Sequence, residues 1–345
     1  MKAASNGKLR VLALFHDKLV PPEGATEAEA RTSEWKTEYD VVTALSALGH
    51  EVRPLGVAGD LAPIRKAVEE WKPHIAFNLL EAFDDVATWD QNVVAYLELT
   101  KVRYTGCNAR GLLLARDKAI TKKLLSYHRI PVTDFAVFGM GRPVKRPKRL
   151  GFPLIVKSLT LDASIGISQA SVVESEEKLA ERVRFIHDSI GTDALVESYV
   201  EGRELYVGIV GNDRLRVLPI WELLFTKMPE EQRKIATERL KWSLTYQKKH
   251  GIVSGEAKEF PEGIAARIRE ICKRVYRNLM LSGYARIDLR LGENGAVYVI
   301  EANPNPQLAR DEDFAESAKA AGLSYDRLIQ HILGLGMRWE PSRLG

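Results

Sequence analysis

The sequence predicts a mixed α/β protein of two or three domains, the first of them built on a parallel sheet. Its 345 residues are too many for one ordinary core, because a domain usually has about 150 residues. A content of 45% hydrophobic and 28% charged residues is typical of a globular protein. Strand-like and helix-like runs also alternate from the first apolar segment onward, which is the pattern of a parallel sheet with crossover helices.

The first domain is expected over residues 1–106. Strand-like and helix-like runs alternate in it, with strands at 9–15, 51–57 and 74–80 and helices at 33–50 and 60–71. This order predicts a Rossmann-like sheet. No GxGxxG motif follows the first strand, so a dinucleotide is not expected.

The second segment, 107–196, mixes short helices and strands. A helix over 117–132 ends at Pro131, a strand follows at 152–158, and an exposed helix over 175–189 begins at the N-cap candidate Ser175.

The third segment, 197–345, opens with strand-like runs. The polar, charged stretch 225–255 is expected to be a mobile covering loop. Apolar residues then recur every three or four positions from Ile264 to Leu279, which predicts a helix leading into a hairpin.

Composition also excludes several classes of protein. A net charge of +4 is small for this length and gives no reason to expect nucleic acid. No apolar run approaches the roughly 18 residues of a membrane span, and the apolar run near the start is too short for a signal peptide. Cys107 and Cys272 lack the spacing of a zinc or disulfide framework, so free thiols in a reducing cytoplasm are expected.

The hairpin RIDLRLGENGAVYVIEANPNP, residues 286–306, carries the clearest chemical signal. Strand alternation places Arg286, Asp288 and Arg290 on one face, and Glu301 and Asn303 project together from the returning strand. Two carboxylates and an amide are hard oxygen ligands that suit Mg²⁺ or Mn²⁺. An edge hairpin whose acidic groups pair with the two arginines is an equally open interpretation.

Two lysines and a small-residue loop support the metal interpretation. Lys118 begins a helix, and Lys157 lies in the apolar strand FPLIVKS, where a lysine is rare without an anionic partner. The loop LDASIGIS, 161–168, offers backbone N–H groups to phosphates. Each feature alone has an ordinary structural explanation, but together they indicate a nucleoside triphosphate site.

The ordered motifs YTGC, DKAITKKLL, FPLIVKS, SIGIS, VESYVEGREL, RIDLRL and VIEANPNP resemble the ATP-grasp superfamily, and within it the D-alanine–D-alanine ligase-like group. The resemblance covers about residues 102 to 335. It implies a Rossmann-like domain over 1–106 and two α+β domains, 107–196 and 197–345, that clasp ATP. It further implies an ADP-forming carboxylate–amine ligase that acts through an acyl phosphate, on amino acid or peptide substrates, and a homodimer by family analogy.

The resemblance also implies residue roles. Lys118 and Lys157 would hold the phosphates, and Lys241 in the covering loop would approach the γ-phosphate. Ser164 would lie over substrate and phosphates, and Arg286 would stabilise the oxyanion. The backbone from Glu197 through Ser198 and Tyr199 to Val200 would pair with adenine, and Glu204 with ribose. Two Mg²⁺ or Mn²⁺ ions would be bound by Asp288, Glu301 and Asn303.

The substrate-facing segments depart from the family pattern. The HGxxGEDG segment is replaced by LLEAFDDVATWDQN, and the GGxSxE loop is missing. In the region of that loop, Glu34 and Glu38 are expected on one helix face, as ammonium ligands or as a solvated surface. After the hairpin, NPQLARDEDF offers Gln307 for the oxyanion, Arg310 for a substrate carboxylate or side chain, and Asp311 with Glu312 for an ammonium group.

Three alternatives remain open. The departures would also suit a tailoring ligase that modifies a peptide or other natural-product substrate. A nucleotide-binding regulator without turnover belongs to another class, although Lys118, Lys157, Asp288, Glu301 and Asn303 are all present. A phosphotransferase would leave phosphate on its product.

Overall fold

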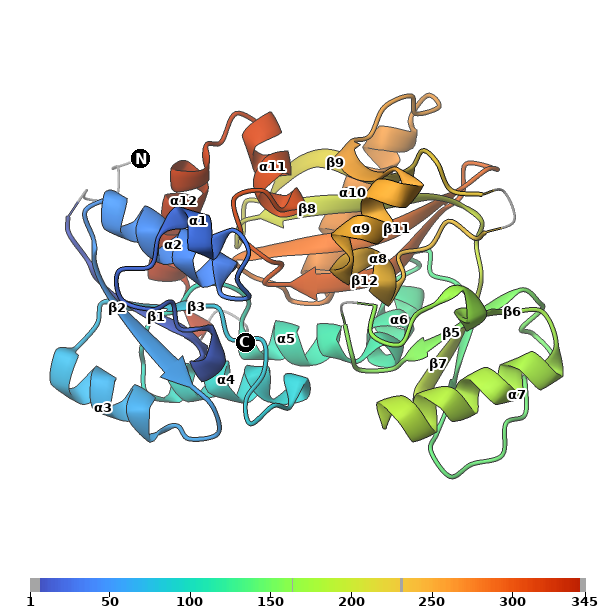
Figure 1. Ribbon diagram of the computed structural model, residues 1–345, viewed down its shortest axis with the longest axis horizontal. Coiled ribbons are helices and arrows are strands. Elements are labelled where there is room, and N and C mark those ends of the chain that lie inside the picture. Colours follow the sequence, from blue (N-terminus) through green and yellow to red (C-terminus); the bar gives the residue numbers. More distant parts are fainter. Residues whose placement is uncertain (1–6, 163, 230–231, 342–345) are drawn as a thin grey trace.

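The structure is a computed structural model and describes residues 7–162, 164–229 and 232–341. The chain forms three sheets, each flanked by helices, and the third sheet in sequence lies between the first and the second (Figure 1). In the described part of the chain, no helix is both long enough and apolar enough to cross a membrane.

The first sheet has the order β2-β1-β3 with both pairs parallel, which confirms the predicted parallel α/β domain. Its central strand is buried because Val11 to Phe15 are all apolar. The strands are β1 (Arg10–His16), β2 (Glu51–Val57) and β3 (Ile75–Asn78); the helices are η1 (Asp17–Leu19), α1 (Glu27–Ala30), α2 (Lys36–Ala47), α3 (Ala62–Trp71), η2 (Ala87–Trp89) and α4 (Asp90–Leu99).

The last two helices return to this first sheet. α11 (Asp313–Ala320) and α12 (Tyr325–Arg338) follow the third sheet in sequence, yet Ile332 of α12 packs in one cluster with Val11 of β1 and Phe77 of β3. In Figure 1 the red helix α12 accordingly lies beside the blue helix α2. Both ends of the chain therefore build the first core.

The second sheet in sequence, called the central sheet for its place in the chain, has the order β4-β7-β5-β6 and is antiparallel. The expected cap is confirmed, since the side chain of Ser175 accepts a hydrogen bond from Lys178 N at the start of α7. The elements are α5 (Ala109–Arg116), α6 (Lys118–Tyr127), β4 (Phe135–Phe138), β5 (Leu154–Ser158), η3 (Gln169–Ser171), β6 (Val172–Val173), α7 (Glu176–Phe185), η4 (Ile186–Ile190) and β7 (Ala194–Ser198).

The third sheet has five antiparallel strands in the order β10-β9-β8-β11-β12. The helix that the apolar residues from Ile264 to Leu279 predicted is confirmed as α10, in which Ile268, Ile271 and Val275 are buried. The elements are β8 (Gly202–Val210), β9 (Arg216–Phe225), α8 (Glu238–Trp242), α9 (Leu244–His250), β10 (Ile252–Glu256), α10 (Ile264–Asn278), β11 (Tyr284–Gly292) and β12 (Val297–Pro304). The stretch 225–255 is therefore partly helical.

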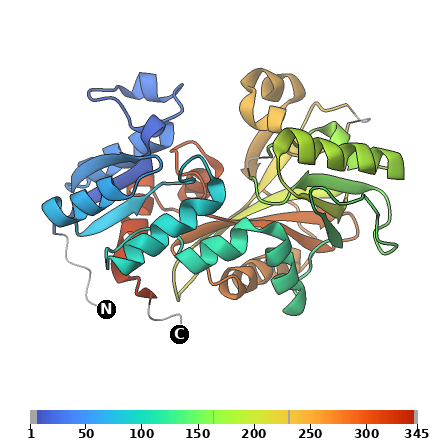
Figure 2. The ribbon, with the colours of Figure 1, turned by 90° about the horizontal axis from the view of Figure 1, so that it is seen from below.

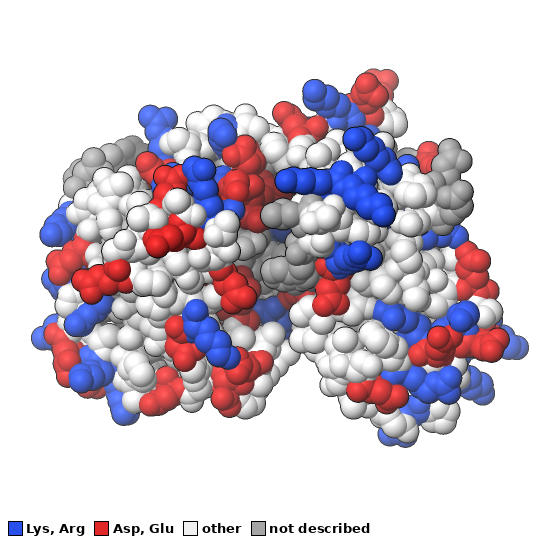
Figure 3. Space-filling model, in the orientation of Figure 1, with Lys and Arg blue, Asp and Glu red and all other residues white. Residues whose placement is uncertain are grey.

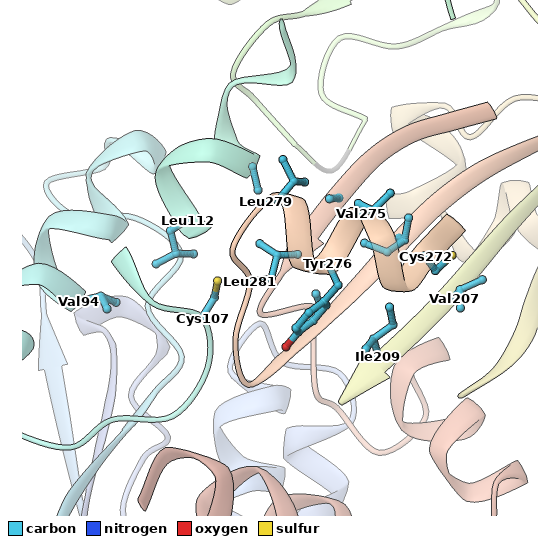
Figure 4. Packing of buried hydrophobic residues seen from close by; sticks show 14 of the residues in the cluster. Val94, Cys107, Leu112, Val207, Ile209, Cys272, Val275, Tyr276, Leu279 and Leu281 are labelled. Atoms are coloured by element: carbon cyan, nitrogen blue, oxygen red, sulfur yellow. The ribbon is translucent and has the colours of Figure 1, made fainter. Parts of the chain in front are cut away.

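One apolar core joins the first sheet to the third. Figure 4 shows Val94, Leu112 and Cys107 on one side, Ile209 and Val207 on the other, and Leu281 and Tyr276 between them. α5 and α6 run beneath this junction, as the view from below shows (Figure 2). Both cysteines are buried free thiols, as expected.

Candidate active site

A pocket lies between the central and third sheets. β5, the loop 161–168, the end of β7, and the hairpin β11–β12 supply its walls, and it brings together most residues selected from the sequence: Lys118, Lys157, Ser164, Glu197, Ser198, Tyr199, Val200, Glu204, Asp288 and Glu301. The surface is hollowed between the part that holds the first sheet with α11 and α12 and the part that holds the other two sheets (Figure 3).

The hairpin register sets its polar residues side by side. Asp288 lies opposite Glu301, and Asn303 lies opposite Arg286. Asn303 Nδ2 donates to Asp288 Oδ2 at 2.9 Å and to Glu301 Oε1 at 3.3 Å. The convergence that side-chain alternation predicts is therefore present in the structure.

One of the ion pairs expected in the alternative interpretation of the hairpin, the pair of Arg286 with Asp288, is also present. Arg286 donates to both carboxylate oxygens of Asp288, at 2.7 and 2.9 Å. Arg290 lies elsewhere, 3.3 Å from Glu204 Oε2, and it donates to the carbonyl oxygens of Gly202 and Lys234. β11 is also an interior strand, so the hairpin is not a plain edge hairpin.

The donor set suits a hard divalent ion. The hairpin offers two carboxylates and one amide, and no group of three or more His, Cys, Asp or Glu side chains arranged for a metal occurs among the described residues. Such a small oxygen set is how Mg²⁺ is held when waters and substrate phosphates complete its shell. Rotation of the Asn303 amide exchanges its nitrogen for its oxygen toward the carboxylates.

Lys157 belongs to a buried group of three charges. Its Nζ lies 2.5 Å from Glu197 Oε1, and Lys122 Nζ lies 2.7 Å from Glu197 Oε2. Burial by itself raises the pKa of Glu197, but the two lysines lower it to about 2. Two cations share this carboxylate, and the carboxylate of Glu301 also acts on both, while Lys157 lines the pocket, where it can meet a phosphate.

Lys118 is held at the other side of the pocket. Its Nζ donates to Asp162 Oδ1 and to the carbonyl oxygen of Leu161, both at 2.8 Å. Arg116 binds Asp162 too, and it also binds Asp90 of the first domain. Burial raises the pKa of Asp162, but Lys118 and Arg116 bring it below its usual range.

The loop 161–168 and the first residue of α8 are joined by hydrogen bonds. Gly166 N donates to Glu238 Oε2 at 2.7 Å, and Glu238 N donates to Ile167 O at 3.0 Å. Ser164 has a φ of 58°, a left-handed conformation that is strained for this residue. Lys241 lies within α8, but its side chain is outside the described part of the structure.

The segment between β7 and β8 connects the two sheets at the pocket. Ser198 N donates to Asp134 O at 2.9 Å, and Tyr199 N donates to Pro153 O at 3.0 Å. Glu204 accepts from the Tyr206 hydroxyl at 2.9 Å and pairs with Arg290. The backbone donors of Ser198 and Tyr199 are therefore already used inside the protein.

The expectation that Glu34 and Glu38 share a helix face is wrong. α2 begins at Lys36, because Trp35 has φ −86° and ψ 21°, outside the helical region, and Glu34 is exposed in the preceding turn. Glu38 lies in the first turn and is only 4% exposed.

The segment after the hairpin is fastened to the first domain. Lys36 Nζ lies 2.5 Å from Asp311 Oδ1, and Arg310 N donates to Asp40 Oδ2 at 2.9 Å. The Arg310 side chain also lies 4.2 Å from the ring centre of Tyr325. Gln307 is exposed. Arg310 and Asp311 thus have structural partners, which the sequence did not indicate.

Several polar residues of the site escaped the sequence interpretation. Lys122 looks like one more lysine of an amphipathic helix, and only its position one turn after Lys118 hinted at the same face. Arg116 and Asp162 have no motif that sets them apart from surface charges, and Arg290 was expected on the hairpin face but not as the partner of Glu204. Their partners come from distant parts of the chain.

The fold and the pocket define an ATP-grasp protein, in which a Rossmann-like domain is followed by two sheets with a nucleotide pocket between them. The family model for the C-terminus of D-ala D-ala ligase matches residues 124–334. The D-alanine–D-alanine ligase of Desulforudis audaxviator is 31% identical over 317 residues, with 90% of this chain and 96% of the relative covered. The uncharacterized protein y4sG of Sinorhizobium fredii is 31% identical over 306 residues, with 86% of each covered.

Solved structures agree on the fold. The D-alanine–D-alanine ligase of Bacillus anthracis, in complex with ATP, superposes with a TM-score of 0.73 at 22% identity and covers 96% of this chain and 98% of its own. The VanG D-Ala:D-Ser ligase of Enterococcus faecalis gives 0.68 at 18% identity, with 96% and 100% covered. The chain belongs to the D-alanine–D-alanine ligase family and is an ATP-dependent, ADP-forming carboxylate–amine ligase.

Proposed function

We propose that this ligase activates a small carboxylic acid, an amino acid or short peptide, as an acyl phosphate and then transfers the acyl group to an amine. The observation that carries the proposal is the pocket that joins Lys118 and Lys157 to the hairpin carboxylates Asp288 and Glu301. Cations suited to a triphosphate lie there beside oxygen ligands suited to its metal ions.

Mg²⁺ or Mn²⁺, in our proposal two ions, would be held by Asp288, Glu301 and Asn303. Bound there, the metal would neutralise the charge on the phosphate oxygens and fix their geometry. The donor set described above supports this assignment.

In the first step, a substrate carboxylate oxygen attacks the γ-phosphorus, the bond to the β-phosphate oxygen breaks, and ADP leaves. The substrate carboxylate and the triphosphate are both negative and repel each other. Lys157 and Lys118 are assigned to bind the phosphates and so to reduce this repulsion. Both lysines are anchored by carboxylates, which fixes their position before ATP arrives. Val200 is the preferred backbone donor to adenine, because the N–H groups of Ser198 and Tyr199 are engaged.

In the second step, the amine nitrogen attacks the acyl carbon, the bond to the phosphate oxygen breaks, and the amine proton leaves to a base or to water. Arg286 is assigned to stabilise the oxyanion, and its contact with Asp288 fixes its orientation. Burial alone would lower the pKa of Arg286, but Asp288 raises it above the usual value, so the group stays charged.

Relatives named as D-alanine–D-alanine ligases suggest amino acid substrates. We propose a different substrate for this chain, because its first-domain segment and the segment after the hairpin depart from the family pattern. We further propose a cytoplasmic enzyme, since ATP and reduced thiols belong there, and a homodimer, which light scattering on the purified chain would test.

Glu301→Gln tests the site. The loss of one metal-binding carboxylate is expected to lower ATP-dependent ADP release by at least about 100-fold. Glu293→Gln, an exposed change at the turn of the same hairpin, is the matched control and should leave the rate unchanged. Undiminished turnover in a folded Glu301→Gln protein would refute the metal assignment.

A further inference from the structure

Arg290 is a buried arginine that lines the nucleotide pocket. It lies on β11, two residues after Asp288, and its side chain is only 8% exposed. Its charged partner is Glu204, the residue opposite it in register on β8, with 3.3 Å between Nη2 and Oε2. A guanidinium is expensive to bury, so it needs several hydrogen-bond partners, and those partners indicate its role.

The first group that Arg290 holds is the carboxylate of Glu204, which also lines the pocket. Glu204 Oε1 accepts from the Tyr206 hydroxyl at 2.9 Å, while Oε2 faces Arg290. A carboxylate has about four acceptor positions, so these two contacts orient it and leave capacity for a donor in the pocket. The carboxylate repels the phosphates of ATP, whereas the neutral hydroxyl groups of the ribose are donors that suit it.

The second group that Arg290 holds is the cover. Its Nη1 donates to the carbonyl oxygen of Lys234 at 3.0 Å and to that of Gly202 at 3.1 Å. Lys234 belongs to the covering segment 225–255, and the next residue, Ile235, is 2% exposed and lines the pocket. One guanidinium therefore joins the cover, the start of β8 and the carboxylate in the pocket.

Tyr199 connects the cover to the same place by a second contact. Its ring centre lies 5.9 Å from the guanidinium carbon of Arg290 and 5.5 Å from that of Arg233, the residue before Lys234. The face of an aromatic ring attracts guanidinium groups. The segment after β7, the cover and β11 therefore meet around Tyr199, which lines the pocket as well.

We propose that Arg290 is a positioning residue that couples recognition of the ribose by Glu204 to closure of the cover through Lys234. The inference rests on the proposed function, since it requires ATP in this pocket with its ribose at Glu204. Arginine suits this role because its planar guanidinium presents donors in several fixed directions, which a lysine ammonium on a flexible stem does not. The nucleoside half of ATP then helps to hold the cover closed, together with the phosphates.

Binding of stable nucleotides tests the ribose part without any acid or amine. Calorimetry in the presence of Mg²⁺ compares ADP with 2′-deoxy-ADP and 3′-deoxy-ADP. The wild-type protein is expected to bind ADP at least about 10-fold more tightly than one of the deoxy forms, since a hydrogen bond to a charged group contributes about that factor. Arg290→Met should lose most of this preference, because Glu204 is then oriented by Tyr206 alone, and Arg290→Lys should keep part of it.

A double-mutant cycle shows whether Arg290 acts through Glu204. Glu204→Gln should erase the same preference, and the double variant should be about as impaired as the worse single variant. Losses that simply add would show that the two residues act separately and would overturn the inference. Arg269→Met, an exposed change on α10, which packs on the same sheet, is the control and should bind the three nucleotides as the wild type does.

The yield of trapped product tests the cover. The enzyme is incubated with ATP, Mg²⁺, a panel of amino acids and hydroxylamine, which converts an acyl phosphate into a stable hydroxamate and free phosphate. Arg290→Met should raise the ratio of phosphate released to hydroxamate formed by about 5-fold, since one hydrogen bond contributes about that factor to closure. Glu204→Gln should raise it much less, because Lys234 keeps its contact with Arg290.

The inference requires both effects, so an unchanged nucleotide preference or an unchanged ratio in Arg290→Met would overturn it. If Arg290→Met does not fold, Arg290→Lys takes its place with the same expected directions. Equal binding of the three nucleotides to the wild-type protein would overturn the pairing of Glu204 with the ribose, and this inference with it. Absence of hydroxamate from every acid with the wild-type protein would count against the proposed function instead.

Discussion

At the scale of single residues, the buried carboxyl of Glu38 costs stability when it is ionised. Its folded-state pKa of about 7 lies above the ordinary value of 4.5. For a carboxyl with a raised pKa, the folded form is favoured below pH 4.5, where the group is protonated in both states. That advantage is lost as the pH rises from about 4.5 to about 7, because the unfolded chain ionises more readily.

Glu38→Gln should therefore stabilise the protein at high pH. We expect a gain in unfolding free energy of up to about 3 kcal/mol at pH 8.5 and almost none at pH 4, since Gln imitates the protonated carboxyl. Urea unfolding of both proteins at the two pH values measures it. The same gain at both pH values would contradict the shifted pKa, and Glu69→Gln, an exposed change on α3, should show none at either.

At the scale of elements, the covering segment 225–255 is joined by hydrogen bonds to Gln169 of η3, which directly follows the loop 161–168. Gln169 Nε2 donates to Arg233 O, and Arg233 N donates to Gln169 Oε1, both at 2.9 Å. Together with the Glu238 contacts, this reciprocal pair fastens the cover over the pocket. A closed cover is needed because an acyl phosphate hydrolyses in water.

Gln169→Ala should loosen the cover and uncouple the reaction. Each of the two lost hydrogen bonds contributes about 1 kcal/mol, so closure becomes roughly 10-fold or more less favourable. More acyl phosphate should then hydrolyse, which raises the ratio of phosphate released to hydroxamate formed. The exposed change Glu177→Ala on neighbouring α7 should not alter the ratio. An unchanged ratio in Gln169→Ala would show that this pair does not control closure.

The elements differ in how far the sequence predicted them. The strand at 9–15 is a continuous apolar run, while the helix from Ile264 and the hairpin carry a clear periodicity, and the structure confirms each. α8 and α9 were not expected within 225–255, because charge dominates that stretch. Their N-caps, Thr237 and Ser243, were the available signals. The role of Arg310 and Asp311 depends on contacts with α2, which no local pattern specifies.

At the scale of the whole molecule, the first sheet depends on the far end of the chain. α12 covers that sheet through Leu328, Ile332 and Leu333, all completely buried. Gly336 brings the helix so close to the chain before α5 that an added Cβ would lie 2.3 Å from Tyr104 O. The C-terminal helix thus stabilises the first sheet.

Ile332→Ala should therefore destabilise the core of the first domain. Loss of a completely buried isoleucine side chain usually costs about 2 to 5 kcal/mol. Because one apolar core continues from the first sheet to the third, we expect a single unfolding transition at lower urea, followed equally by fluorescence and circular dichroism. Arg327→Ala, exposed on the same helix, should leave the midpoint nearly unchanged. Two separate transitions would instead show that the first domain unfolds independently of the central and third sheets.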